Sequence, residues 1–292
     1  MSGALWASVS GVGFGLFQAF NSRAVRDLDS VYVSTFLQLL VAGGVLLAAS
    51  VATENLGSLG DATAWGLVAF ALAGMIHFFA GWTTLNLSQA RIGAARTSPL
   101  LATTPLFGLA FGVALESQVP GWLAAAGIAL TIGGAYLVTD PGGSERPRLH
   151  DSVFGLATAC AWSASAIFTL QGLKSLDSPL LGVTIGMLSS ALAYGALLAV
   201  ARMPLRVRDQ MGEALALKLL AGVIVALATW GRWLALDDTD IAVVLALNLI
   251  SVPVVLFVAP IISGRHVEVV TGRIWVGAAL VIAGALLLIG EA

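Results

Sequence analysis

The feature that most constrains this chain is a series of long apolar runs. A helix needs about 17–25 mostly apolar residues to cross a bilayer core, and only 10% of the 292 residues are charged, against about 25% in a soluble domain. We therefore expect an all-α integral membrane protein, multi-pass in a cell inner membrane. The runs predict ten transmembrane helices, at about 4–22, 31–51, 64–86, 92–114, 120–138, 152–171, 179–200, 215–236, 240–262 and 273–290.

Several classes of function are disfavoured by what the sequence lacks. The single cysteine, Cys160, excludes an internal disulfide, and a net charge of −2 without a basic patch argues against nucleic acid as a partner. His77 is the only one of three histidines inside a predicted span, so no zinc cluster is expected. The motifs of intramembrane proteases and the phosphate-binding loop of ATPases are missing. We expect no enzyme activity, no catalytic residue, no metal and no cofactor.

The middle of the chain holds its longest polar stretch, TDPGGSERPRLHD at residues 139–151. This position suggests a duplication, and an offset of 148 residues aligns the two sides. The sequence thus predicts a first five-helix repeat at 1–139, a linker at 140–151 and a second repeat at 152–292. Because five is odd, the repeats must be inverted in the membrane. The aligned pairs are Leu28-Asp29-Ser30 with Leu176-Asp177-Ser178, Phe14 with Trp162, Gly74 with Gly222, Trp82 with Trp230, and Pro105 with Pro253.

The stretch GMIHFFAGWTTLNLSQARIGAARTSPLLATTPLFGLAFGVALESQVPGWLAAAGIALTIGGAYLV resembles the last three helices of an EamA repeat of the drug/metabolite transporter superfamily. The second copy is less clear, because Gly264 stands where the glutamate Glu116 stands in the first. The resemblance implies a transporter that exports amino acids, other metabolites or drugs. The residues that carry it are Gly74, Ala90, Gly93-Ala94, Pro105, Glu116, Gly127 and Gly133-Gly134, then Gly222, Ala242, Pro253 and Gly284.

The orientation in the membrane has two interpretations. Lysine and arginine concentrate in cytoplasmic loops, and here they follow the odd-numbered helices, which predicts both termini outside the cytoplasm. The family resemblance implies both termini inside. The basic residues are Arg23, Arg26, Arg91, Arg146, Arg148, Arg202, Arg206, Arg208, Lys218, Arg265 and Arg273, with Lys174 on the other side.

The third predicted helix carries the clearest polar stripe. Gly74, His77, Gly81, Thr84 and Ser88 follow spacings of three and four, so they share one helical face. His77 at mid-depth is either a ligand-binding or proton-carrying group, since imidazole titrates near neutral pH, or a neutral histidine bonded to a neighbouring helix.

Other polar and aromatic side chains in the spans complete a candidate substrate site. Each has a structural alternative: small-residue packing, an interfacial aromatic anchor, an arginine that reaches the interface, or a proline kink whose free carbonyls bond to hydroxyls. Pro105 and Pro253 are the candidate hinges. The substrate-binding candidates are His77, Gly81, Thr84, Trp82, Gln18, Gln38, Trp162, Ser163, Ser98, Asn248, Ser251, Arg96 and Arg232.

Every Asp and Glu lies at or beyond the end of a predicted span, and the first span has no carboxylate, which argues against the proton–cation exchange of small multidrug pumps. We expect export of a small metabolite such as an amino acid by alternating access between the repeats. Efflux of drugs or other lipophilic compounds, or lipid flipping on the same scaffold, is the alternative. The expected partners are a small-molecule substrate and the lipid bilayer. Gly108-x-x-x-Gly112 fits either a monomer or a homodimer.

Overall fold

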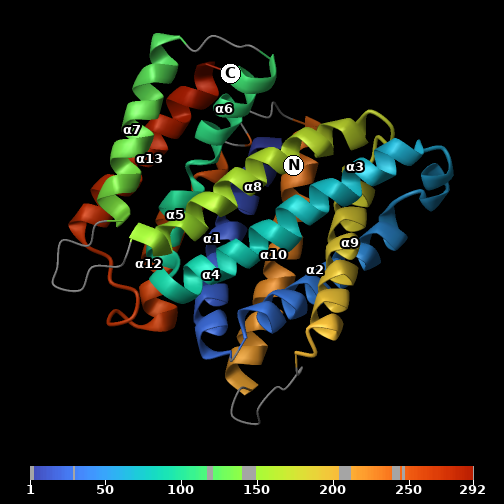
Figure 1. Cartoon of the computed structure of the whole chain (residues 1–292), viewed down its shortest axis with the longest axis horizontal. Coiled ribbons are helices and arrows are strands. Elements are labelled where there is room, and N and C mark those ends of the chain that lie inside the picture. Colours follow the sequence, from blue (N-terminus) through green and yellow to red (C-terminus); the bar gives the residue numbers. More distant parts are fainter. Residues whose placement is uncertain are drawn as a thin grey trace.

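The structure is a computed structural model that describes residues 3–28, 30–116, 121–139, 149–203, 212–238, 244 and 247–291. These residues form helices and turns, and no strand occurs among them (Figure 1). The helices are α1 (Gly3–Asp27), α2 (Val31–Thr53), η1 (Leu56–Gly60), α3 (Ala64–Gly74), the π-helix η2 (Met75–Gly81), α4 (Trp82–Ile92), α5 (Ala94–Leu101), α6 (Thr104–Glu116), α7 (Trp122–Thr139), α8 (Leu149–Leu173), α9 (Pro179–Val200), α10 (Gly212–Asp238), α12 (Ser251–Ser263) and α13 (Gly272–Glu291).

The all-helical membrane fold expected from the sequence is confirmed. Seven segments of the described chain are long and apolar enough to cross a membrane, and α7 and α12 are shorter apolar helices. The third predicted helix is longer than expected, because α3, η2 and α4 form one continuous span to Ile92. Part of the ninth predicted helix, at residues 240–243 and 245–246, lies outside the described residues, as does most of the predicted linker.

The predicted single helix at 92–114 is instead two helices, α5 and α6, separated by Ala102 and Thr103. Pro105 has no N–H, so the helical ladder cannot pass through it unbroken. The hydroxyl of Thr103 donates to the carbonyl of Leu100 at 2.6 Å, and that of Thr104 donates to Leu101 at 2.6 Å. These bonds satisfy carbonyls that the break would leave unpaired in an apolar interior.

The two halves begin their second helices in the same way. Ser30 caps α2, its hydroxyl accepting from the Val33 N–H at 3.3 Å, and Ser178 caps α9 by accepting from Leu181 at 3.2 Å. The two serines are 148 residues apart. A serine N-cap satisfies one of the free N–H groups at a helix start, so the serine of the repeated motif has the same local structural role at both positions.

Helices with the same place in each half pack antiparallel. Along α2 and α9, Phe36 lies near Gly195 while Ser50 bonds to Thr184 at 2.9 Å. The pair of α7 and α13, which stands at one side of the bundle in Figure 1, runs antiparallel in the same sense. Its close approaches are Gly127 with Gly284 and Gly134 with Gly277. Counterparts related by an inverted repeat are expected to run in opposite directions.

The remaining helices also pack in matched pairs. α1 packs against α10 and α12, and its counterpart α8 packs against the α3–η2–α4 span, α5 and α6. Because these helices lie parallel or antiparallel to one another, their turns gather at two ends of the bundle. We call the end with the α8–α9 turn and the start of α3 the open end. We call the end with the α1–α2, α4–α5 and α12–α13 turns the closed end.

Glycines set the closest helix contacts. A Cβ at Gly74 of α3 would lie 2.1 Å from the backbone oxygen of Gly186 in α9, so only glycine permits this backbone approach. At the matching position of α10, Gly222, a Cβ would lie 2.9 Å from the side chain of Val41 in α2. Small residues replace hydrophobic association as the means of helix packing in lipid.

We predict that Gly74→Ala lowers the stability of the folded chain by about 1–3 kcal/mol, because the added methyl group must force α3 and α9 apart. Thermal unfolding of the detergent-purified protein measures the effect. Gly44→Ala is the matched control, since a Cβ at Gly44 meets nothing within 4 Å. Equal unfolding temperatures for the two variants would contradict this account of the α3–α9 contact.

Candidate functional site

A cavity of about 430 Å³ lies between the two halves of the bundle. Its lining comes from α1, α3, η2, α4, α5 and α6 of the first half and from α8, α9, α10 and α12 of the second. Towards the open end the lining reaches Asp177, an exposed residue of the α8–α9 turn, and Arg232 of α10. Towards the closed end it stops at Gln18 of α1, Trp82 of α4 and Ser98 of α5. Among the described residues, the cavity therefore opens towards one end of the bundle and is closed at the other.

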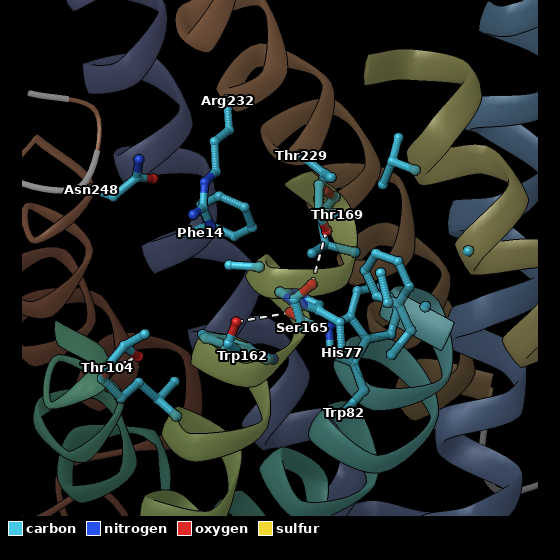
Figure 2. Close-up of a pocket in the computed structure, with 18 of the residues that line it drawn as sticks. Phe14, His77, Trp82, Thr104, Trp162, Ser165, Thr169, Thr229, Arg232 and Asn248 are labelled. Atoms are coloured by element: carbon cyan, nitrogen blue, oxygen red, sulfur yellow. Dashed lines mark hydrogen bonds between the residues drawn. The ribbon is translucent and has the colours of Figure 1, made fainter. Parts of the chain in front are cut away.

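One wall of the cavity is aromatic. The ring of His77 stacks on the indole of Trp162, with centroids 5.3 Å apart and planes 8° from parallel, and it meets Phe78 edge-on at 4.7 Å (Figure 2). Phe78 also meets Trp82 edge-on at 5.1 Å. Stacked and edge-on rings of this kind offer an apolar face with polar ring edges.

Ser165 fixes the position of His77. Its hydroxyl lies 3.0 Å from His77 Nδ1 and 2.8 Å from the carbonyl oxygen of Trp162. The hydroxyl has one proton, which it donates to the carbonyl, so in a neutral imidazole Nδ1 must be the donor to Ser165 and Nε2 the free acceptor. His77 also lies in η2, and a π-helical turn inside an α-helical span often marks a functional site.

The opposite part of the cavity is polar. Figure 2 shows Arg232 extending from α10 to the ring of Phe14, with Asn248 at the neighbouring edge of the cavity. No hydrogen bond or ion pair involves the Arg232 guanidinium within the described part of the chain. Four buried lining atoms also lack a partner among the described residues: Gln18 Oε1, Ser98 Oγ, Trp162 Nε1 and Asn248 Oδ1. Buried polar atoms are rarely left unpaired, so these groups are suited to bind a polar solute.

Most of the candidates proposed from the sequence come together at this cavity. Nine line it: Gln18, His77, Trp82, Ser98, Pro105, Trp162, Asn248, Ser251 and Arg232. The cavity combines a mostly apolar lining with a few convergent polar groups, which is the usual composition of a small-molecule site.

Six candidates do not line the cavity. Gly81 and Thr84 belong to the seam with α8: a Cβ at Gly81 would touch Trp162 at 2.9 Å, and Thr84 bonds to Thr158 at 2.8 Å. The polar stripe of the third helix is therefore mainly a helix-packing surface, from which Gly74 and His77 reach the cavity. The others outside the lining are Gln38, Ser163, Arg96 and Pro253.

The structure corrects one placement and adds residues that the sequence analysis missed. Lys218 was counted among the basic loops, but it is fully buried in α10, where its ammonium donates to Asn21 and Gln38. Glu268, in the turn between α12 and α13, is 3% exposed. The spacing of three from Gln18 to Asn21 on one helix face could have indicated this second polar group. Nothing in the sequence around Glu268 indicates its burial.

The model of the EamA-like transporter family matches residues 1–140. Residues 1–140 belong to the EamA-like transporter family. This family is part of the drug/metabolite transporter superfamily of multi-pass membrane transporters. EamA-like proteins are transporters rather than enzymes.

A solved crystal structure extends the likeness to both halves. It matches 96% of this chain and 96% of its own, with a TM-score of 0.59 and 19% sequence identity. At that identity the likeness shows a shared fold alone. A comparison with curated proteins found no match.

We predict that Ser165→Ala lowers the stability of this EamA-like protein by about 0.5–1.5 kcal/mol, the usual net contribution of a hydrogen bond. Without the Ser165 hydroxyl, His77 should no longer be restricted to one tautomer. Nitrogen-15 NMR of labelled histidine would detect a mixture of the Nδ1–H and Nε2–H forms. Ser8→Ala is the control, since the exposed Ser8 hydroxyl bonds only to Ala4 of its own helix. An unchanged His77 tautomer in Ser165→Ala would contradict the assignment.

Proposed function

We propose that this EamA-like protein transports a small, carboxylate-bearing metabolite such as an amino acid across a cell inner membrane, by alternating access between its two halves. The observation that carries the proposal is the position of Arg232 in the cavity, facing a wall of stacked aromatic rings. The direction we propose is export.

The charge of the cavity supports an anionic group on the substrate. Among the described lining residues, Arg232 and the exposed Asp177 are the ones with acidic or basic side chains, apart from His77. A guanidinium half-buried in an apolar interior is costly unless an anion or several acceptors pair with it. A carboxylate can accept two parallel hydrogen bonds from one guanidinium, which gives both affinity and orientation.

The size of the cavity supports a small solute. Its volume of about 430 Å³ lies near the lower limit of the roughly 300–1,000 Å³ typical of ligand pockets. The aromatic wall can receive an apolar side group of the solute by stacking, while Asn248 and Gln18 offer amide groups to its polar end. The same apolar wall favours lipophilic drugs as the second candidate substrate class.

We predict that carboxylate-bearing amino acids stabilise the purified protein in a thermal-shift screen, because a ligand stabilises the folded state in proportion to the logarithm of its concentration over Kd. Arg232→Gln should weaken that binding by roughly 10–150-fold, the equivalent of losing a charged hydrogen bond of about 1.5–3 kcal/mol. Arg202→Gln, at an exposed arginine after α9, is the control.

A parental protein that responds only to cationic or uncharged lipophilic compounds would replace the proposed substrate class with drug efflux. Equal amino-acid binding by Arg232→Gln and the parent would exclude Arg232 as the carboxylate partner.

His77 is the imidazole of the cavity wall, with Ser165 at its Nδ1, so it is our candidate for linking transport to protons. We predict that His77→Ala abolishes the pH dependence of solute uptake into proteoliposomes between pH 5 and 8. His77→Gln keeps a hydrogen-bonding side chain without a titrating ring, and it should lose the pH dependence while retaining more uptake. Full pH-dependent uptake by His77→Ala would rule out this role.

A further inference from the structure

The closed end of the bundle contains two clusters of buried polar side chains that the cavity does not use. Both clusters lie beyond the last lining residues Gln18, Trp82 and Ser98, on the side away from the open end. Polar groups in a membrane interior are costly and usually functional, so two such clusters at the one place where the cavity is blocked need an explanation.

The first cluster is centred on the carboxylate of Glu268. Its Oε1 accepts from the Ser22 hydroxyl at 2.9 Å and from the Arg26 guanidinium at 2.8 Å. The backbone N–H groups of Ala94 and Ala95, at the start of α5, donate to Oε1 at 2.9 Å and Oε2 at 3.1 Å. One carboxylate from the α12–α13 turn thus connects α1 and α5 of the first half to the second half.

The backbone makes room for this carboxylate. Gly93, between α4 and α5, has φ of +78°, and a Cβ at this position would lie 2.5 Å from Glu268 Oε2. A residue with a side chain would be strained in this backbone conformation, and its side chain would also displace the carboxylate. The glycine turn and Glu268 are therefore matched to each other.

The second cluster is centred on Lys218. Its ammonium donates to the side-chain oxygens of Asn21 in α1 and Gln38 in α2, the latter at 2.6 Å. The Asn21 amide donates in turn to Asn86 and Gln89 of α4, at 2.6 Å each. These five side chains are all fully buried. Lys218 is held by amide oxygens, with no carboxylate in its described contacts, so the cluster binds α10 of the second half to α1, α2 and α4 of the first.

The offset of 148 residues between the two halves gives each of these positions a counterpart in the other half. Adding or subtracting 148 converts Asn21 to Thr169, Gln38 to Gly186 and Lys218 to Phe70, and these three counterparts all line the cavity. Three of the positions that close one end of the bundle thus have counterparts that line the cavity. An inverted pair of halves that exchanged conformations would open the first end and close the second.

We propose that the closed end is a gate, with Glu268 as its latch to Arg26 and the start of α5, and with the Lys218 cluster as a second, independent contact between the halves. The gate rests on the transport function proposed above and assigns residues to the step that exposes the cavity to the second side. Because each cluster joins the two halves, breaking either one shifts the population towards the state open at this end.

The test uses a cysteine that reports which side of the membrane the cavity faces. Cys160 is the single cysteine of the chain, so Cys160→Ala with Ala166→Cys leaves one thiol in the cavity lining. A membrane-impermeant maleimide is applied to spheroplasts and, separately, to inverted membrane vesicles. The parental reporter should be labelled from one side of the membrane only.

In this background Glu268→Gln and Arg26→Gln should each raise labelling from the opposite side by about tenfold or more, equivalent to about 1.4 kcal/mol. The double variant should add little to either single change, since both remove one shared interaction. Glu213→Gln, at a carboxylate of the same end whose side chain is 78% exposed, should leave the one-sided labelling unchanged.

Labelling from the original side and a monodisperse elution profile show that each variant is folded. If the Glu268 variant does not fold, Lys218→Gln tests the gate through the second cluster. Folded variants that all retain the one-sided labelling of the parent would overturn the proposal.

Solute uptake measured in parallel separates the two proposals. Solute uptake together with unchanged labelling in every variant would contradict the proposed gate but would not contradict the proposed transport function. A shift in labelling without movement of any tested solute would support the gate and count against the proposed substrate class.

Discussion

The structure depends on the high cost of leaving a polar group unpaired in an apolar interior. Several polar side chains that enter the bundle away from the cavity have a partner on another helix, as Thr84 has Thr158 and Ser50 has Thr184. The same constraint closes the break between α5 and α6, where threonine hydroxyls bond to the free carbonyls. Four buried polar atoms without a partner among the described residues line one cavity, and they support it as the candidate site.

Close helix packing and the cavity are linked by the same positions. Gly74 lets the backbones of α3 and α9 approach, and both Gly74 and Gly186 line the cavity near this contact. His77 follows Gly74 within the π-helical segment η2, which changes the direction of side chains along the span. The stacked pair of His77 and Trp162 is therefore held by rigid helix contacts rather than by a loop, as a preformed binding wall requires.

The two ends of the bundle differ although the sequence repeat relates them. At the closed end, Asn21, Gln38 and Lys218 bond across the boundary between the halves, while their counterparts at the other end border the cavity. Hydrogen bonds that form in one conformation and are lost in another are suited to a gate, because each is strong in a low-dielectric interior and its loss is compensated by water when the end opens. In this view the aromatic wall binds the solute and the polar clusters determine which side it can leave from.

The sequence by itself determined the solvent and the class of fold, because ten apolar runs with few charges can be stable only as helices in lipid. It also indicated most of the cavity, since polar residues at mid-depth in a membrane span must face an interior. Tertiary structure decided which members of a polar stripe face the cavity and which face a helix seam, as His77 and Thr84 show. It also decided the burial of Lys218 and Glu268, because the partners of each lie at distant positions in the chain, and spacing along one helix carries no information about a neighbour that only packing brings into contact.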